Sequence, residues 1–122
     1  MKNSDALNNL NSLVTVSQAT NVFPVSVGYK IIKNMKVLKN ALEPYEEMRN
    51  KIVTKYDKSG LVKEDNPEYQ DCLKDISELN MQETDVELDT ISIDDIKDLE
   101  IPMNILTNLS CMIEWLWKKL YY

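Results

Sequence analysis

The sequence predicts a mainly α protein, in which a kinked antiparallel helical hairpin is joined by a C-terminal helix and a short β element. The first observation is the scarcity of glycine, since only Gly28 and Gly60 occur among 122 residues. The second is a run of apolar residues at alternating steps of four and three, which is typical of a long helix that packs along one side. The third is the presence of prolines where helices are expected to begin, because proline fits the first helical turn. With 43% hydrophobic residues, the chain is expected to fold as one domain.

We expect this single helical domain, residues 1–122, to contain four consecutive regions. They are an N-terminal helix within residues 1–20, a helical hairpin over 24–82, an acidic segment over 83–100 and a C-terminal helix over 101–122. The N-terminal helix is predicted over residues 5–18, because Leu7, Leu10 and Val14 follow Ser4 and Asp5 at helical spacing.

The first helix of the hairpin carries the strongest pattern. Its predicted packing stripe consists of Ile31, Met35, Leu38, Leu42, Tyr45, Arg49, Ile52 and Tyr56. Pro44 lies inside this run and is expected to kink the helix near Leu42, since proline lacks the amide proton and clashes with the preceding turn. The stripe keeps its phase across Pro44, so a full break is not expected. Arg49 is the only charge in the stripe, and we predict that a carboxylate of the returning helix pairs with it: Glu68, Asp71 or Asp75.

A loop and a second helix complete the predicted hairpin. Gly60 is expected to end the long helix, because glycine adopts positive φ freely. The sequence Asn66-Pro67-Glu68 predicts the next helix start, with a cap, a proline and an early carboxylate. The apolar stripe of this helix is expected to contain Tyr69, Leu73 or Cys72, Ile76 and Leu79.

After the hairpin, the spacing of the apolar residues changes. Val86, Leu88 and Thr90 alternate with acidic residues, which predicts a short edge strand near residues 86–91, paired with Leu61-Val62 or with residues 22–25. Ser92 and Asp95 have the spacing of a capping box that starts a short helical turn. Pro102 is expected to start the last helix, whose packing face would contain Met103, Leu106, Leu109 or Ser110, Ile113, Trp117 and Leu120.

The charges are separated along the chain. The acidic segment has a local net charge of -7. Its acidic surface consists of Glu83, Asp85, Glu87, Asp89, Asp94, Asp95, Asp98 and Glu100. A basic ridge of lysines at every third position consists of Lys30, Lys33, Lys36 and Lys39. Two readings of the acidic surface stay open, a solvated face and a mimic of a nucleic-acid backbone.

The basic ridge has three interpretations. It can be a solvated face, a site for a small ligand or nucleotide, or the surface that the acidic segment covers and neutralises. Specific binding of nucleic acid is not expected, because no arginine or aromatic residue is interleaved with the lysines and the whole chain is acidic.

The residue types argue against catalysis. Histidine is absent, which removes the commonest general base and transition-metal ligand. No glycine-rich phosphate loop, paired-cysteine zinc motif or EF-hand loop is present. Cys72 and Cys111 lie in apolar helical patterns, and we expect buried reduced thiols in preference to a disulfide. We therefore expect no enzyme activity, no cofactor, no metal site and no membrane span.

Four aromatic residues gather at the C-terminus, and they are the candidate partner-binding residues: Trp115, Trp117, Tyr121 and Tyr122. Two helical positions that are two residues apart differ by about 200° in direction. If the last helix continues through them, only one tryptophan can face the core of the protein. We therefore expect this tail to mediate self-association or target docking.

Residues 23–34, FPVSVGYKIIKN, resemble the segment LP-[IV]-K-V-S-Y-K-x-A-K-N of a family of small bacteriophage and prophage proteins known as domain of unknown function 1617. Residues 46–56 are similar to the family's EE-x-R-x-K-[LI]-x-x-K-Y, and residues 86–93 and 112–114 add further matches. The resemblance covers about residues 7–114. It implies a phage-encoded accessory protein in the host cytoplasm, and it brings no activity and no assigned site.

Together, the residues and the resemblance predict a protein that acts by binding a host or phage protein. Inhibition of a host enzyme or defence system is the first alternative. A role in assembling the phage particle or its tail is the second, and binding of a small ligand or nucleotide is the third. A homo-oligomer is also compatible with the aromatic tail.

Overall fold

The computed structural model describes residues 1–19 and 23–114. It has four α-helices: α1 (Asn3–Ser17), α2 (Val25–Tyr56), α3 (Tyr69–Asn80) and α4 (Met103–Leu109). The short strands β1 (Ile91–Ser92) and β2 (Ile113–Glu114) form a two-stranded parallel sheet, and 3-10 turns occupy Ile93–Asp95 and Ser110–Met112. The predicted mainly α fold with a short β element is confirmed.

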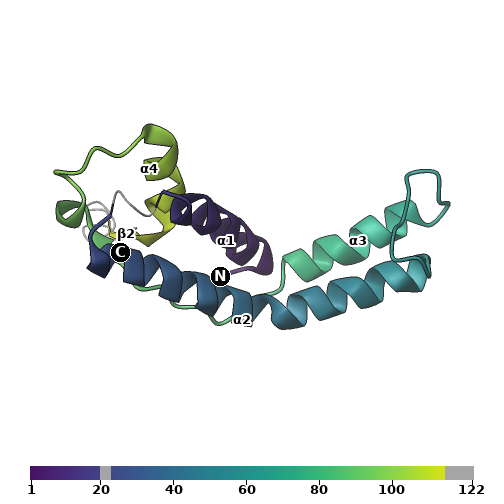
Figure 1. Cartoon of the computed structure of the whole chain (residues 1–122). Coiled ribbons are helices and arrows are strands. Elements are labelled where there is room, and N and C mark those ends of the chain that lie inside the picture. The colour runs from purple at the N-terminus through teal and green to yellow at the C-terminus, as the bar shows by residue number, and fades with distance from the viewer. Residues whose placement is uncertain (20–22, 115–122) are drawn as a thin grey trace.

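Helix α2 runs the length of the molecule, and α1 and α3 lie one after the other along it (Figure 1). Helix α4 packs on α1, so three helices and the small sheet surround the main core at one end. At the other end, α2 and α3 form the predicted antiparallel hairpin and pack on each other. The main core contains Ala6, Leu13, Val16, Val27, Ile31, Leu38, Leu42, Tyr45, Ile91, Ile96, Ile105, Leu109, Met112 and Ile113.

Backbone hydrogen bonds join the start of α1 to the end of α3. The Asn3 amide donates to the Gln82 carbonyl at 2.9 Å, and the Thr84 amide donates to the Met1 carbonyl at 2.8 Å. The side-chain amide of Asn3 also donates to the Leu79 carbonyl at 2.9 Å. These bonds satisfy groups that the two helix ends would otherwise leave without partners, and they fix α1 and α3 end to end.

The N-terminal helix buries a different set of residues from the predicted one. Ala6, Leu13 and Val16 are fully buried, whereas Leu7 is half-buried and Val14 is exposed. The helix packs between α2 and α4, so its buried side is set by two neighbours. Spacing within α1 alone did not identify that side.

Helix α2 is continuous through Pro44, as the sequence predicted, and its axis bends near its middle (Figure 1). The packing stripe, however, differs from the predicted one at two positions. Asn34 is fully buried beside Met35, which is half-buried against the core, and Arg49 is exposed, with no carboxylate partner among the described residues. A heptad pattern assumes one partner along the whole helix. Here α1, α3 and an extended segment cover successive parts of α2, so the buried side changes along its length.

The turn of the hairpin follows the sequence prediction at Gly60, whereas α3 begins at Tyr69 and not at the predicted Pro67, and its cap residue Glu68 makes no side-chain cap bond. Gly60 has φ 81°, and its amide donates to the Asp57 carbonyl at 2.9 Å. The Asn66 side chain accepts a hydrogen bond from the Glu68 amide at 2.8 Å just before α3 begins. The predicted apolar stripe of α3 contained either Cys72 or Leu73. In the structure, Cys72 is buried and Leu73 is exposed.

The predicted β element was wrong in its position and in its partner. Residues 84–90 are extended but form no strand, although Val86 and Leu88 are half-buried against the core. The strand is Ile91–Ser92, and it pairs with Ile113–Glu114 in parallel. This pairing joins segments that are far apart in the sequence, so no local pattern could reveal it.

The predicted continuous C-terminal helix was also wrong. Helix α4 ends at Leu109, and the chain becomes extended at Ile113–Glu114. Its buried residues are Ile105 and Leu109, whereas Met103 is 74% exposed. Trp115, Trp117, Tyr121 and Tyr122 lie outside the described residues.

Candidate functional site

The acidic segment covers part of the basic ridge. Residues 83–92, named the strap here, run along α2 (Figure 1). Lys33 forms an ion pair with Asp89, with 2.9 Å between Nζ and Oδ2, and the Lys30 ammonium donates to the Thr90 carbonyl at 3.0 Å. Of the three interpretations of the ridge, internal neutralisation therefore describes Lys33, whereas Lys30 binds the backbone of the strap. Lys36 and Lys39 are exposed.

The ion pair shifts the pKa of both groups. The hydrogen bond with Asp89 and its negative charge raise the pKa of Lys33, and the same contact lowers the pKa of Asp89. Both side chains are about half exposed, so water screens their attraction and the pair adds little to stability.

Asn34 holds the strap more firmly than the charges do. Its side-chain amide donates to the Asp89 carbonyl at 2.9 Å, and its side-chain oxygen accepts from the Asp89 amide at 2.9 Å. The side chain is 1% exposed, so both bonds are shielded from water. Sequence analysis missed this residue, because an asparagine on a helix gives no local sign of a partner fifty-five positions away.

Half of the acidic surface is engaged within the described part of the chain. Glu83 pairs with the N-terminal ammonium at 3.1 Å, and Asp94 pairs with Lys97 at 3.7 Å. Asp95 accepts from the Ser92 amide at 2.9 Å, which confirms the predicted capping box. With Asp89, four of the eight acids thus have structural roles, and this gives the nucleic-acid mimic no support.

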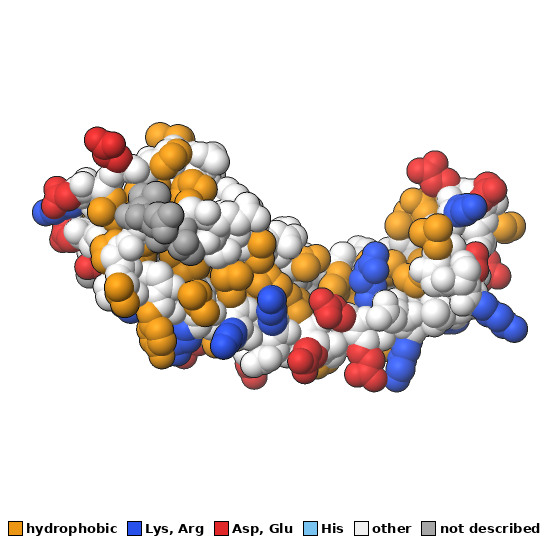
Figure 2. All heavy atoms as spheres, in the orientation of Figure 1, with side chains coloured by type: hydrophobic (Ala, Val, Ile, Leu, Met, Phe, Trp, Pro, Cys, Tyr) orange, Lys and Arg blue, Asp and Glu red, His pale blue; other side chains and the backbone are white. Residues whose placement is uncertain are grey.

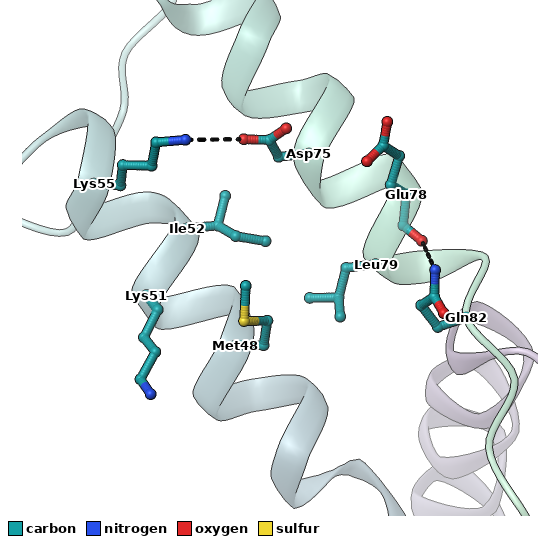
Figure 3. A pocket seen from close by; sticks show the side chains of 8 residues that line it. All are labelled: Met48, Lys51, Ile52, Lys55, Asp75, Glu78, Leu79 and Gln82. Carbon is teal, nitrogen blue, oxygen red and sulfur yellow. Dashed lines mark hydrogen bonds and ion pairs between the residues drawn. The ribbon is translucent and has the colours of Figure 1, made fainter.

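An open groove of about 600 Å³ lies between α2 and α3. Met48, Ile52 and Leu79 point toward one another in the space between the two helices (Figure 3). Charged and polar side chains line its edges: Lys51 and Lys55 on α2, Asp75 and Glu78 on α3, and Gln82 just after α3. The groove therefore combines an apolar floor with polar edges.

Met48 is central to this surface. Its side chain is 47% exposed, and it also lines two neighbouring hollows, one beside Pro44 and Glu47 and one beside Tyr45 and Asp85. On the face shown in Figure 2, hydrophobic side chains reach the surface along the middle of the molecule and at the hairpin end, among acidic and basic side chains. Methionine is flexible and polarisable, which suits a surface that adapts to a partner.

The end of the groove nearest the hairpin loop is closed by polar contacts. The Tyr56 hydroxyl donates to the Asp75 carboxylate at 2.5 Å, and Lys55 lies 3.9 Å from the same carboxylate. The hydrogen bond to Asp75 is the main cause that raises the pKa of Tyr56 to about 12. At the other end, the Tyr45 hydroxyl donates to Asn80 at 2.7 Å and joins α2 to the end of α3.

We predict that Tyr56 makes the hairpin sensitive to alkaline pH. Folded Tyr56 keeps its proton to about pH 12, whereas unfolded Tyr56 loses it near the ordinary value of 10.0. The contribution of this group is therefore fully present below pH 10.0 and declines as the pH rises toward 12. Denaturant unfolding across this range should show a steeper loss of stability for the wild type than for Tyr56→Phe, and parallel curves would contradict the prediction.

A second hollow lies at the start of α2. It has a volume of about 340 Å³, and its lining includes Val16, Phe23, Val25, Tyr29 and Ile32. Val25, Tyr29 and Ile32 are exposed and lie at helical spacing on one side.

The described residues provide no metal-binding cluster and no membrane-spanning helix. Within residues 1–19 and 23–114, no three acidic or cysteine side chains are placed to hold a metal ion. Cys72 is a free buried thiol, as expected, and Cys111 is half-buried. None of the helices in these two ranges has the length and apolarity that crossing a bilayer requires.

No family model matches the chain, and comparisons with curated proteins and with solved structures likewise found no match. The resemblance to the phage family therefore stays a prediction from the quoted residues.

Proposed function

We propose that this protein acts by binding another protein, and that a helix of the partner lies in the groove between α2 and α3. The observation that carries the proposal is the partly exposed Met48 over the apolar floor formed with Ile52 and Leu79. Recognition of an amphipathic helix by an apolar groove is a recurrent mode of protein binding.

The architecture supports a helix as the occupant. At the core end, α4 packs on α1 and α1 packs on α2, whereas at the hairpin end α3 packs on α2 with no third helix beside them among the described elements (Figure 1). Two helices bury only one side of each other, so the third position of a bundle is open along the groove. A partner helix would complete it.

The biological role follows from the resemblance and is part of the proposal. A phage-encoded accessory protein in the host cytoplasm would use the groove on a host protein, such as an enzyme or a defence factor. A partner in phage particle or tail assembly is the alternative. A ligand site on the basic ridge has less support, because Lys30 and Lys33 already contact the strap.

The test is a comparison of variants in a capture experiment. Met48→Glu places a charge on the apolar floor, and we expect it to reduce partner recovery at least about tenfold, because a buried unpaired charge disfavours docking. Met103→Glu is the matched control, since Met103 is an exposed methionine on α4, away from the groove.

Wild-type protein and the two variants would be incubated with lysate of phage-infected host cells, and bound proteins would be quantified by mass spectrometry. A protein that wild type and Met103→Glu retain and that Met48→Glu loses supports the proposal. Equal recovery by all three proteins would show that the groove is not the binding surface.

A further inference from the structure

We infer that the partner helix is cationic, with lysine or arginine beside its apolar stripe at the end nearest the core of this protein. This inference rests on the proposed function of the groove. It concerns the charged side chains that line the groove and the adjoining hollow, some of which form ion pairs and some of which do not.

The basic groups beside the groove already face carboxylates. Lys55 lies 3.9 Å from Asp75, and Lys51 lies 3.8 Å from Glu47. The N-terminal ammonium lies 3.1 Å from Glu83. These ion pairs neutralise Lys51 and Lys55 on α2. They also neutralise Glu83, which lines the adjoining hollow.

Of the carboxylates that line the groove and the adjoining hollow, two form no ion pair with the described residues. Glu78 lines the groove from α3, and Asp85 lines the adjoining hollow that shares Met48 and Leu79 with the groove. Figure 3 shows the Glu78 carboxylate pointing away from Leu79 and from α2, at the edge of the groove. A cation that binds either carboxylate would not displace an existing ion pair.

Among the side chains that line the groove and the adjoining hollow, the charges without an ion pair are both negative, and this selects between possible occupants. An anionic helix would place its carboxylates near Glu78 and Asp85, where like charges repel. A cationic helix would place opposite charges there and its apolar stripe on Met48, Ile52 and Leu79. The attraction is between partly exposed groups, so it is expected to weaken with salt.

Two designed peptides of about 15 residues provide the test, since shorter isolated helices are marginal in water. Both carry the same leucine stripe at helical spacing, and one has lysine where the other has glutamate beside the stripe. Fluorescence anisotropy would measure their binding to the full chain at low and high salt. We expect the lysine peptide to bind about tenfold more tightly at low salt, with a smaller difference at high salt.

Variants assign the effect to the groove. Glu78→Gln with Asp85→Asn removes both charges and should reduce the preference for the lysine peptide to about twofold or less. Met48→Glu places a charge on the floor under the leucine stripe, so it should weaken both peptides. Glu64→Gln with Asp65→Asn, which removes two exposed charges from the hairpin loop, is the matched control and should leave the preference unchanged.

Each outcome has a separate meaning. Equal binding of the two peptides, with loss of both in Met48→Glu, would overturn the inference about charge and leave the proposed groove intact. Tighter binding of the glutamate peptide, or no binding of either peptide, would also overturn it. The capture experiment with Met48→Glu decides the proposed function independently.

Discussion

Leu109→Ala is expected to lower the free energy of unfolding by about 2–5 kcal/mol, the range for truncating a fully buried leucine. Leu109 is 0% exposed and belongs to the main core. The substitution removes apolar contacts and leaves a cavity that α1 and the small sheet can fill only in part. Urea unfolding followed by circular dichroism would measure the loss.

Met103→Ala is the matched control on the same helix. The sequence pattern placed Met103 on the packing face of the last helix, but in the structure its side chain is largely exposed. We expect its truncation to change stability by less than about 0.5 kcal/mol. If Met103→Ala destabilises the protein as much as Leu109→Ala does, the buried side of α4 described here is wrong.

Asn34→Leu is expected to lower the free energy of unfolding by about 2–4 kcal/mol. Leucine has the same branching but is larger, and it leaves both the amide and the carbonyl of Asp89 without their side-chain partner. A buried polar group that loses its hydrogen bond costs about 1–3 kcal/mol, unless the chain moves to expose it to water. Both the loss of these hydrogen bonds and such a movement weaken the attachment of the strap to α2.

Hydrogen exchange separates this effect from a general loss of stability. In Asn34→Leu, the amide of Asp89 should exchange faster relative to the amides in the middle of α2. Asn40→Ala is the control, because Asn40 is an exposed asparagine on the same helix. Unchanged protection at Asp89 in Asn34→Leu would mean that the paired hydrogen bonds do not hold the strap in solution.

The contact between the strap and the basic ridge was partly predictable from the separation of charges along the chain. One interpretation of the sequence was that the acidic segment covers and neutralises the basic ridge, and Asp89 does lie beside Lys33. The charges did not indicate the register. The register is set by Asn34, whose side chain bonds both the amide and the carbonyl of Asp89.

The candidate groove was only partly predictable. The hairpin was predicted from helical spacing, from Gly60 and from Asn66, all of which act through local backbone preferences. The stripe prediction placed Arg49 at the seam, whereas Met48 occupies the groove. An error of one position turns a helical side chain by about 100°, which is enough to exchange a charged residue for an apolar one.

The sequence by itself determined the mainly α class, the helical hairpin, the continuity of α2 through Pro44 and the Ser92 capping box. These features depend on backbone preferences and on contacts within a few residues. Only the tertiary structure decided which sides of α1 and α4 are buried, where the strand lies, and that Asn34 holds Asp89. Burial and parallel strand pairing depend on segments that are distant in the sequence. Local spacing does not show which of these segments will pack or pair at a given position.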